Sequence, residues 1–464
     1  MRMNWSSITS SLLPNRFSFK RRILGAGSWS FAGAAISYAI SLGGNLLFTR
    51  LLVPEMFGVM AIATLVITVL TMFSDIGLLQ NIIQSRRGTD SAYLNTAWTI
   101  QIIRGLLLWL LGLCVASVIV AAIHFELLPK NSVYADPVLP YVIAIISFAM
   151  VIDGFQSTKV SEASRHLSLG RITRMRIFGQ IVGLICTVGW IFLIDRSIWA
   201  LVAGAICSRA VTTPLSHIWL PGVANRLRWD QSAFHEIIHF GKWIFLSSIL
   251  GLLANNADRM LLGGLVGSTT LGIYSIASVL INAIGQMVTT IFTQVSYPAL
   301  SEVERDRPRE LKNSLYRIHR VTAPFVYFCS GLLVVSGNTL IAMLYDPRYA
   351  AAGWMLEVLA VGLLKIPFNL AMWCLLTRGL TRTFTGLVAF HVIIAIVLIP
   401  LGFRLFGLPG ALWGVVASQL FNIPAIIYYQ IKHELFDLPK ELILLPAFLA
   451  GMFLARELTL VLGH

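Results

Sequence analysis

Long apolar blocks separated by short polar breaks run through the whole sequence. The pattern is clearest from Gly241 to Ser301, where two apolar runs flank four small or polar residues, 267–270. Each run is longer than the roughly 20 residues that an α-helix needs to cross the hydrocarbon of a bilayer. A break this short can only join antiparallel neighbours, so the stretch predicts a transmembrane hairpin.

The same pattern predicts twelve transmembrane helices in all. They cover residues 23–49, 55–83, 96–123, 138–157, 177–194, 198–220, 243–266, 271–299, 321–345, 353–377, 384–405 and 409–430. A last apolar run, 442–462, is interrupted by two charged residues and predicts a thirteenth span, with an interfacial helix as the alternative. With 57% hydrophobic and 12% charged residues, the chain could not cover a soluble surface. The predicted fold class is an all-α polytopic membrane protein.

Two segments of the sequence resemble each other. When residues 50–63 are shifted by 214 positions without a gap, Gly58 falls on Gly272 and Ile62-Ala63 on Ile276-Ala277. Both segments lie where one predicted helix ends and the next begins. The match indicates two halves of six helices each, a plan found in many transporters. The predicted divisions are a tail, two halves, the linker between them and a C-terminal extension: 1–22, 23–221, 222–242, 243–431 and 432–464.

Positive charges are distributed unequally between the two sides of the predicted membrane. Loops on the side of the N-terminus hold 25 Lys and Arg residues, and loops on the other side hold 6. Cytoplasmic loops carry the excess of Lys and Arg, so the N-terminus is predicted to be cytoplasmic. Residues 1–22 are interpreted as a retained tail, with a secretory signal as the alternative. The net charge of +14 therefore indicates topology and attraction to anionic lipid, and not binding to nucleic acid.

The sequence contains no pattern typical of a soluble catalytic domain. The five cysteines lie inside apolar runs without metal-binding spacing, and no GxxxxGK[ST] motif is present. The loops predicted to face outward are short, and the longest covers about residues 124–137. We therefore expect no catalytic residue, no metal and no cofactor, and a transporter is favoured over an enzyme.

Four sequence motifs carry a resemblance to a known family. They are RLLVPEMFG (Arg50–Gly58), FSDIGL (Phe73–Leu78), NNADRMLLGGLVGSTTLGIYSIA (Asn255–Ala277) and SYPALS (Ser296–Ser301). In order, spacing and position the chain resembles the polysaccharide transporter family, the Wzx-type flippases, of the multidrug/oligosaccharidyl-lipid/polysaccharide exporter superfamily. The resemblance covers roughly residues 22–432.

The resemblance has several implications. It implies two six-helix bundles around a central cavity in a bacterial cytoplasmic (inner) membrane. The implied activity is the flipping of polyprenyl-diphosphate-linked oligosaccharides during the biosynthesis of lipopolysaccharide, exopolysaccharide or another exported polysaccharide. Implied partners are membrane lipid, a polysaccharide polymerase and the export machinery. The two-half plan is compatible with a monomer.

Charged residues inside the predicted helices are the candidate site residues. An Arg or Lys at the membrane midplane costs at least a few kcal/mol unless it is paired or hydrated. Cations that line a wet cavity would bind a diphosphate, so Arg209, Arg259, Lys365 and Arg104 are the predicted substrate-binding residues. Structural ion pairing is the competing interpretation, chiefly between Asp75 and Arg104. Asp75 and Asp258 are also candidates to bind a coupling H⁺ or Na⁺, with further candidates at Asp153, Glu357 and His391.

Three functions are weighed on this basis. The flippase, working by alternating access, accounts for the paired hairpins and the intramembrane cations. A cation-coupled multidrug exporter of the same superfamily would favour anionic groups in the cavity. A polytopic glycan polymerase or glycosyltransferase would favour a large outer loop or an outward acidic pair, and the sequence has only scattered acids there.

Overall fold

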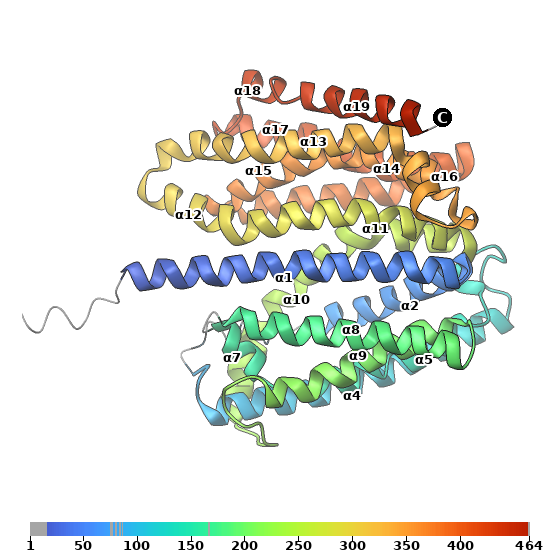
Figure 1. Cartoon of the computed structure of the whole chain (residues 1–464). Helices are drawn as coiled ribbons and strands as arrows, with labels where there is room; N and C mark the ends of the chain where they lie inside the picture. The colour runs from blue at the N-terminus through green and yellow to red at the C-terminus, as the bar shows by residue number, and fades with distance from the viewer. Residues whose placement is uncertain are drawn as a thin grey trace, which may run out of the picture.

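The computed structural model describes residues 16–74, 78, 81–82, 85, 87–165 and 168–462. The described chain is helical apart from its loops, and its long helices run roughly parallel to one another (Figure 1). The first half contains α1 (Arg16–Leu51), α2 (Pro54–Phe73), α4 (Ser91–His124), α5 (Leu139–Ile146), α6 (Ala149–Gly154), α7 (Lys159–Arg165), α8 (Leu169–Leu193) and α9 (Ile198–Ile218).

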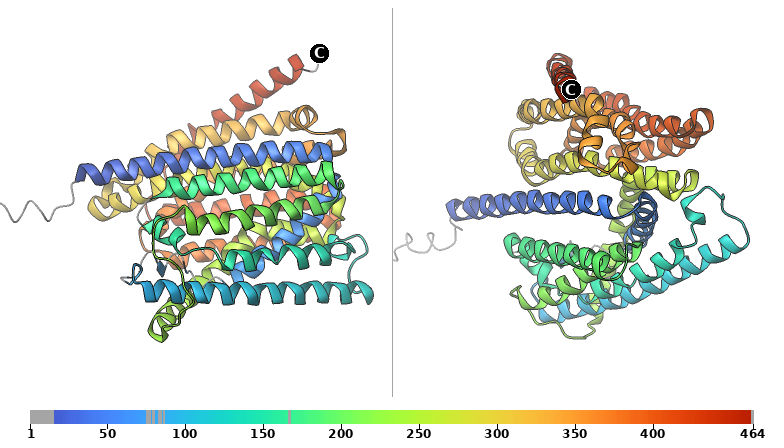
Figure 2. Two further views of the ribbon diagram at one scale, coloured as in Figure 1. Left: turned by 60° about the horizontal axis from the view of Figure 1, so that its bottom comes forward. Right: turned by 45° about the vertical axis from the view of Figure 1, so that its right-hand side comes forward.

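The second half contains α10 (Gln231–Leu265), α11 (Ser268–Ile291), α12 (Tyr297–Asp306), α13 (Leu311–Leu344), α14 (Ala352–Val361), α15 (Ile366–Thr377), α16 (Thr381–Leu420), α17 (Asn422–Lys432), α18 (Leu438–Leu442) and α19 (Pro446–Leu462). Short 3₁₀ segments lie at η1 (Val133–Ala135), η3 (Pro308–Glu310), η4 (Pro347–Tyr349) and η5 (Gly362–Lys365), and a π-helical turn, η2, at Phe292–Ser296. The two groups of helices lie on opposite sides of α1 (Figure 2).

The described residues contain nine helical segments that are long and apolar enough to cross a membrane, or ten if the bent stretch 139–165 is one span. One of the nine, Thr381–Lys432, folds back on itself at Gly407, whose φ is +63°. Beyond that turn, a Cβ on Gly402 would lie 2.2 Å from the carbonyl oxygen of Gly410. The segment is therefore an antiparallel hairpin, which confirms the predicted helices 384–405 and 409–430. The C-terminal run passes the same test over Leu438–Val461.

Several predicted helix boundaries are wrong. The predicted helix 55–83 is interrupted at Ser74, because α2 ends at Phe73 and the hydroxyl of Ser74 bonds back to the carbonyls of Leu70 and Thr71; the described residues 78, 81 and 82 beyond it are helical again. The predicted helix 138–157 is broken between α5 and α6. Helices α8, α10 and α13 begin 8 to 12 residues before the predicted starts, because they continue past the apolar run. Apolar runs mark the membrane-embedded part of a helix and not its ends.

The two hairpin turns contact each other directly. Helix α1 ends at Leu51 and α2 begins at Pro54, and 214 positions later α10 ends at Leu265 and α11 begins at Ser268. A Cβ on Gly58 would lie 1.9 Å from the carbonyl oxygen of Ser268, and a Cβ on Gly272 would lie 1.9 Å from that of Pro54. These two contacts exchange under the same 214-residue shift. The sequence repeat is therefore a local two-fold relation in space, and glycine is required where the backbones meet.

Further bonds between the halves cluster at this end of the bundle, which we call the hairpin end (residues 50–58 and 264–272). Loop η4 of the second half reaches the first hairpin, where the Tyr349 hydroxyl donates to the Leu52 carbonyl at 3.1 Å. Loop η1 of the first half reaches the second hairpin, where the Val133 N–H donates to the Val266 carbonyl at 3.1 Å. Because η1 and η4 are also 214 positions apart, each half covers the hairpin of the other.

Helix α10 is shared between the halves. Its start is capped by Asp230, whose carboxylate accepts the N–H groups of Ser232 and Ala233. Its first turns pack Ala233 and Ile237, both fully buried, against a cluster that belongs to α4 and the chain just before it. Farther along, α10 packs extensively on α16 of the second half. In Figure 1, α10 accordingly crosses behind α1 from one group of helices to the other.

Candidate functional site

Each half contains a partly open cavity whose wall carries charged and polar side chains among apolar ones. The first cavity, about 450 Å³, lies among α2, α4, α6, α7 and α8 and is lined by Arg104, Asp153 and Arg176 among others. The second cavity, about 390 Å³, lies among α10, α11, α15, α16 and α17 and is lined by Lys365 and His391 among others. Both volumes are in the range of small-molecule binding sites, and two of the four predicted cations line them.

Arg104 belongs to α4, and its side chain reaches the C-terminal end of α2. Its Nε donates to the Ser74 hydroxyl at 2.9 Å and its Nη2 to the Thr71 carbonyl at 2.9 Å. The last carbonyls of a helix have no partner within that helix, so Arg104 caps the C-terminus of α2 as well as lining the first cavity. The predicted partner Asp75 lies outside the described residues.

Arg209 forms an ion pair with Asp153, which was considered only as a separate candidate. This ion pair was not predicted, because ion pairing was expected chiefly between Asp75 and Arg104. Asp153 lies on α6 and Arg209 on α9, so no spacing along one helix could have linked them. The side chains remain 41% and 43% exposed, and Asp153 lines the first cavity. The pair places a positive and a negative charge together at the wall of this cavity.

The neighbours Asp258 and Arg259 of α10 serve different purposes. The hydroxyl of Tyr274, which is 2% exposed, donates to the carboxylate of Asp258 and joins α10 to α11. Adjacent residues point about 100° apart on a helix, and no ion pair joins these two in the described chain. Arg259 is partly exposed and lines neither of the two cavities. Arg259, like Arg209, is therefore set apart from Arg104 and Lys365, which line the cavities.

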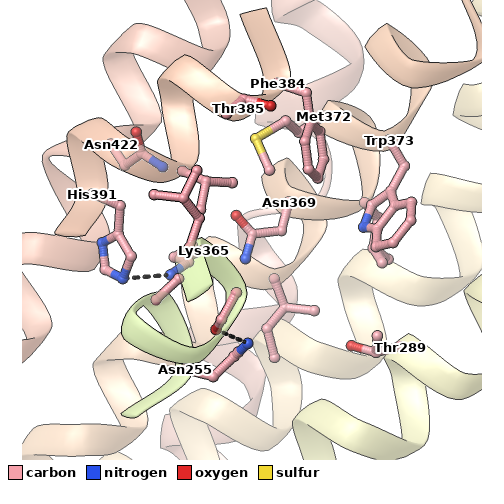
Figure 3. A pocket seen from close by; sticks show the side chains of 16 residues that line it. Asn255, Thr289, Lys365, Asn369, Met372, Trp373, Phe384, Thr385, His391 and Asn422 are labelled. Carbon is pink, nitrogen blue, oxygen red and sulfur yellow. Dashed lines mark hydrogen bonds between the residues drawn. The ribbon is translucent and has the colours of Figure 1, made fainter. Parts of the chain in front are cut away.

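The second cavity is organised by one face of η5 and α15. Lys365, Asn369 and Trp373 are spaced by four residues, so they project from the same side of the helix. All three are partly exposed, whereas Leu370 and Cys374 beside them are buried. Figure 3 shows the three side chains in that order along the wall of the cavity. We call them the Lys-Asn-Trp stripe.

The Lys-Asn-Trp stripe follows from a local break in the helix. Gly362–Lys365 forms the 3₁₀ turn η5 between α14 and α15, and Pro367 occupies the first turn of α15. Proline has no N–H group and fits the first turn of a helix, where that group would be unpaired. The 3₁₀ turn sets where α15 begins, and Ala352–Thr377 as a whole remains one span of membrane length. Sequence reasoning selected Lys365 and missed Asn369 and Trp373, although the spacing of four was visible.

Lys365 faces a histidine of defined tautomer. The Nδ1 of His391 lies 3.1 Å from the Ser418 carbonyl, so Nδ1 carries the proton and Nε2 is the acceptor. The Lys365 Nζ lies 3.5 Å from this Nε2, at the limit of a hydrogen bond (Figure 3). Among the described residues, no carboxylate lies within ion-pair distance of Lys365, and the imidazole of His391 carries no negative charge that could take its place. The ammonium can therefore attract an anion that enters the cavity.

Other polar groups in the second cavity have unused hydrogen-bonding capacity. Asn422 is 2% exposed, and its Oδ1 has no hydrogen-bond partner in the described chain. The Nδ2 of Asn255 donates to the Gly251 carbonyl at 2.7 Å, which leaves its Oδ1 for another donor. Buried polar groups are normally paired, so unpaired ones in a cavity indicate a site for a polar ligand or ordered water.

The fold matches solved transporters at low sequence identity. An inward-facing multidrug resistance MATE family transporter of the MOP superfamily matches with a TM-score of 0.66 and 14% identity, over 90% of this chain and 95% of that one. The lipid II flippase MurJ, in an inward closed conformation, matches with a TM-score of 0.61 and 11% identity, over 96% of this chain and 93% of that one. These likenesses confirm the predicted fold class.

Sequence comparisons match the chain to polysaccharide biosynthesis proteins. The lipopolysaccharide biosynthesis protein WzxC of Escherichia coli (strain K12) is 22% identical over 360 residues, which are 75% of this chain and 68% of the relative. The teichuronic acid biosynthesis protein TuaB of Bacillus subtilis (strain 168) is 24% identical over 315 residues, which are 66% of this chain and 61% of the relative. The family described as polysaccharide biosynthesis protein matches residues 47–353. The chain therefore belongs to this family of multi-pass membrane proteins, and the predicted resemblance is confirmed.

Proposed function

We propose that the protein is a flippase that moves polyprenyl-diphosphate-linked oligosaccharide repeat units across the bacterial cytoplasmic membrane. The observation that carries this proposal is the presence of a polar, cation-bearing cavity in each half of a membrane-spanning bundle. A cation inside the membrane is costly and is retained where it has a function. Polysaccharide biosynthesis, which the family name gives, supplies a lipid-linked anionic substrate.

The cations suit a diphosphate better than a cationic drug. Arg104 and Arg176 line the first cavity, where Asp153 is already paired with Arg209, and Lys365 lines the second. Guanidinium groups match phosphate oxygens in pairs, and an ammonium acts as a compact positive charge. Arg209 reaches the first cavity only through its pair with Asp153, and Arg259 lines neither cavity, so both rank below Arg104 and Lys365.

In the proposed cycle the two halves rock so that the hairpin end and the opposite end of the bundle open in turn. We place the start of α1 in the cytoplasm, because the loops on that side carry the excess of Lys and Arg. The hairpin end then faces outward, and the contacts of Gly58 and Gly272 close the outward path. A diphosphate with about two negative charges gains roughly 5 kcal/mol on moving outward across about 100 mV, inside negative. One chain contains both halves, so we propose that a monomer is sufficient.

The test is transport in vesicles that contain the purified protein. The lumen-facing leaflet would carry a fluorescent polyprenyl-diphosphate oligosaccharide, and its appearance in the other leaflet would be followed with and without an imposed potential. We expect protein-dependent exposure that is faster with an inside-negative potential. Lack of exposure, with a new glycosidic product or drug efflux instead, would refute the flippase. Unchanged transport in each of R209A, R104A and K365A would refute the assignment of the cavities.

A further inference from the structure

The second cavity has features that go beyond the binding of a diphosphate. We propose that the Lys-Asn-Trp stripe binds a phosphate and the sugar attached to it: Lys365 binds the phosphate, Asn369 and Asn422 bind hydroxyl groups, and Trp373 stacks on the sugar ring. This inference rests on the proposed function and assigns a part of the substrate to each residue. It makes the second cavity the place where the glycan is recognised.

The spacing of the stripe matches the order of groups in such a substrate. Four helical residues rise by about 6 Å, so Asn369 and Trp373 lie roughly 6 and 12 Å along the helix from Lys365. A cation, an amide and an indole therefore follow one another on one wall (Figure 3). A glycosyl phosphate presents an anion, hydroxyl groups and an apolar C–H face in the same sequence. A cavity of about 390 Å³ is at the small end of ligand sites, which limits it to the sugar nearest the diphosphate.

The indole is fixed in position before any ligand binds. The Trp373 ring makes near edge-on contacts with Tyr297 and Phe384, with centroid distances of 5.6 and 5.7 Å. Such contacts restrict the side chain to one orientation, so less conformational entropy is lost when a ligand binds. A tryptophan that only filled space would have no reason to lie beside unpaired amides. Here it lies in the same cavity as Asn369 and Asn422.

The unpaired Oδ1 of Asn422 is the independent evidence for a ligand. This side chain is 2% exposed and lines the cavity, yet no described residue donates to its oxygen. A buried acceptor without a donor costs about 1–3 kcal/mol, which a sugar hydroxyl would offset. An apolar drug would leave the oxygen unpaired. A free phosphate has too few hydroxyl groups to satisfy both Asn422 and Asn369, so the chemistry favours a sugar.

The first cavity differs in a way that supports this division. Its wall carries the charged groups Arg104, Arg176 and Asp153, and no tryptophan lines it. The second cavity carries one cation, several amides and Trp373. The two halves share a fold and differ in the chemistry of their cavities. The first cavity therefore suits the diphosphate alone, and the second discriminates between glycans.

The experiment compares two probes that differ only in the glycan. One is the lipid-linked oligosaccharide extracted from the cells that make this protein, and the other is the polyprenyl diphosphate left after its sugars are removed. Binding to the full chain in detergent micelles would be measured by thermophoresis. We expect the glycan to strengthen binding about tenfold in the wild type, the effect of one stacking contact and one hydrogen bond. W373A and N369A should abolish most of that difference and leave the affinity for polyprenyl diphosphate unchanged.

Matched variants separate a local effect from a general one. Trp413 is 50% exposed on α16 outside the cavity, so W413A removes the same side chain without touching the site. N313A is the matching control for N369A, because Asn313 is an exposed asparagine of α13. K365A should weaken binding of both probes, and W373F should retain most of the glycan effect.

Two results would overturn the inference. The first is an equal loss of affinity for both probes in W373A and N369A, which would indicate a structural role. The second is a wild-type protein that binds the two probes equally. If vesicle transport persisted in either case, only the sugar assignment would fall. If transport of the same lipid were also absent, the proposed function itself would fail.

Discussion

Replacing either glycine at the hairpin end should push the two halves apart there. In G58A the new Cβ would lie 1.9 Å from the Ser268 carbonyl oxygen, and in G272A the new Cβ would lie 1.9 Å from that of Pro54. Ordinary contacts of this kind begin near 3.4 Å, so the backbones must separate by about 1.5 Å. The obstructing atom is backbone oxygen in both cases, and it cannot turn aside as a side chain could.

The expected magnitude follows from two opposing effects. Overpacking of a tight contact costs about 1–3 kcal/mol. Alanine in place of glycine inside α2 or α11 stabilises the helix by roughly 1 kcal/mol. The helix effect is the same in every conformation, whereas the steric cost applies only when the hairpin end is closed. The equilibrium between closed and open hairpin ends should therefore shift about 5- to 150-fold toward open, with little change in melting temperature.

Cross-linking across the hairpin end can measure this shift. The Thr269 hydroxyl donates to the Glu55 carboxylate at 2.7 Å, so a short bifunctional thiol reagent can join the cysteines of E55C and T269C across the distance that the glutamate side chain now spans. In a background without the native cysteines, G58A and G272A should each slow the cross-link, and by similar amounts because the 214-residue shift relates them. Gly43 has no heavy atom within 4 Å of its Cβ position, which makes G43A the matched control. Cross-linking in both variants at the rate of G43A would refute the reasoning.

Two further predictions concern charged pairs. In R209A we expect reduced transport and a change in the free energy of unfolding of at most about 1 kcal/mol, because the pair with Asp153 is about two-fifths exposed. Normal transport by the double variant R209A/D153N would mean that Arg209 only neutralises Asp153 and does not bind substrate. At the start of α10, hydrogen bonds from Ser232 and Ala233 and the nearby Arg87 hold the pKa of Asp230 at about 2. The ionised Asp230 therefore stabilises the folded protein fully above the ordinary carboxyl pKa of about 3.9, and this stabilisation is lost as the pH falls toward 2. The melting temperatures of wild type and D230N should differ at pH 5–7 and converge below pH 4. A constant difference across this range would contradict the assignment.

The repeat was the most informative part of the sequence. Gly58 and Gly272 match at a shift of 214 positions, and the structure places each against the backbone of the other hairpin. Sequence similarity alone cannot say that two repeats touch. It indicates the contact here because glycine is conserved between the repeats at the point where no side chain fits.

Other features could not be predicted for physical reasons. The pair of Arg209 and Asp153 joins α9 to α6, and no pattern links these two positions, which are 56 apart in the sequence. The breaks at 147–148 and 362–365 lie inside long, predominantly apolar runs, with only Ser147 and Lys365 as polar residues at the breaks themselves. Hydropathy measures only whether a residue suits lipid, and a 3₁₀ turn suits lipid as well as an α-helix when neighbouring helices cover it. Hydropathy therefore finds helices and misses the breaks that shape the cavities.

The position of α10 restricts how the halves can move. Its first turns are tied to the first half by the ion pair between Arg87 and Asp230 at 3.2 Å and the bond from the Ser85 hydroxyl to Glu236 at 2.6 Å. Residues 226–230 before it are also bonded to Asn95, Thr96 and Thr99 of α4. The predicted linker 222–242 is thus held along the first half, so we propose that the movable boundary lies farther along α10.

A shared helix can follow both halves if it bends gently. Thirty-five residues of α10 span about 52 Å. Long helices curve with radii of roughly 60–100 Å without losing backbone hydrogen bonds, so this length can absorb a rotation of about 30–50°. A sharp kink inside the membrane would instead leave backbone groups unpaired at several kcal/mol each. Continuous bending therefore costs less than either a kink or the release of the first turns, and α10 can remain attached to both halves while the hairpin end opens and closes.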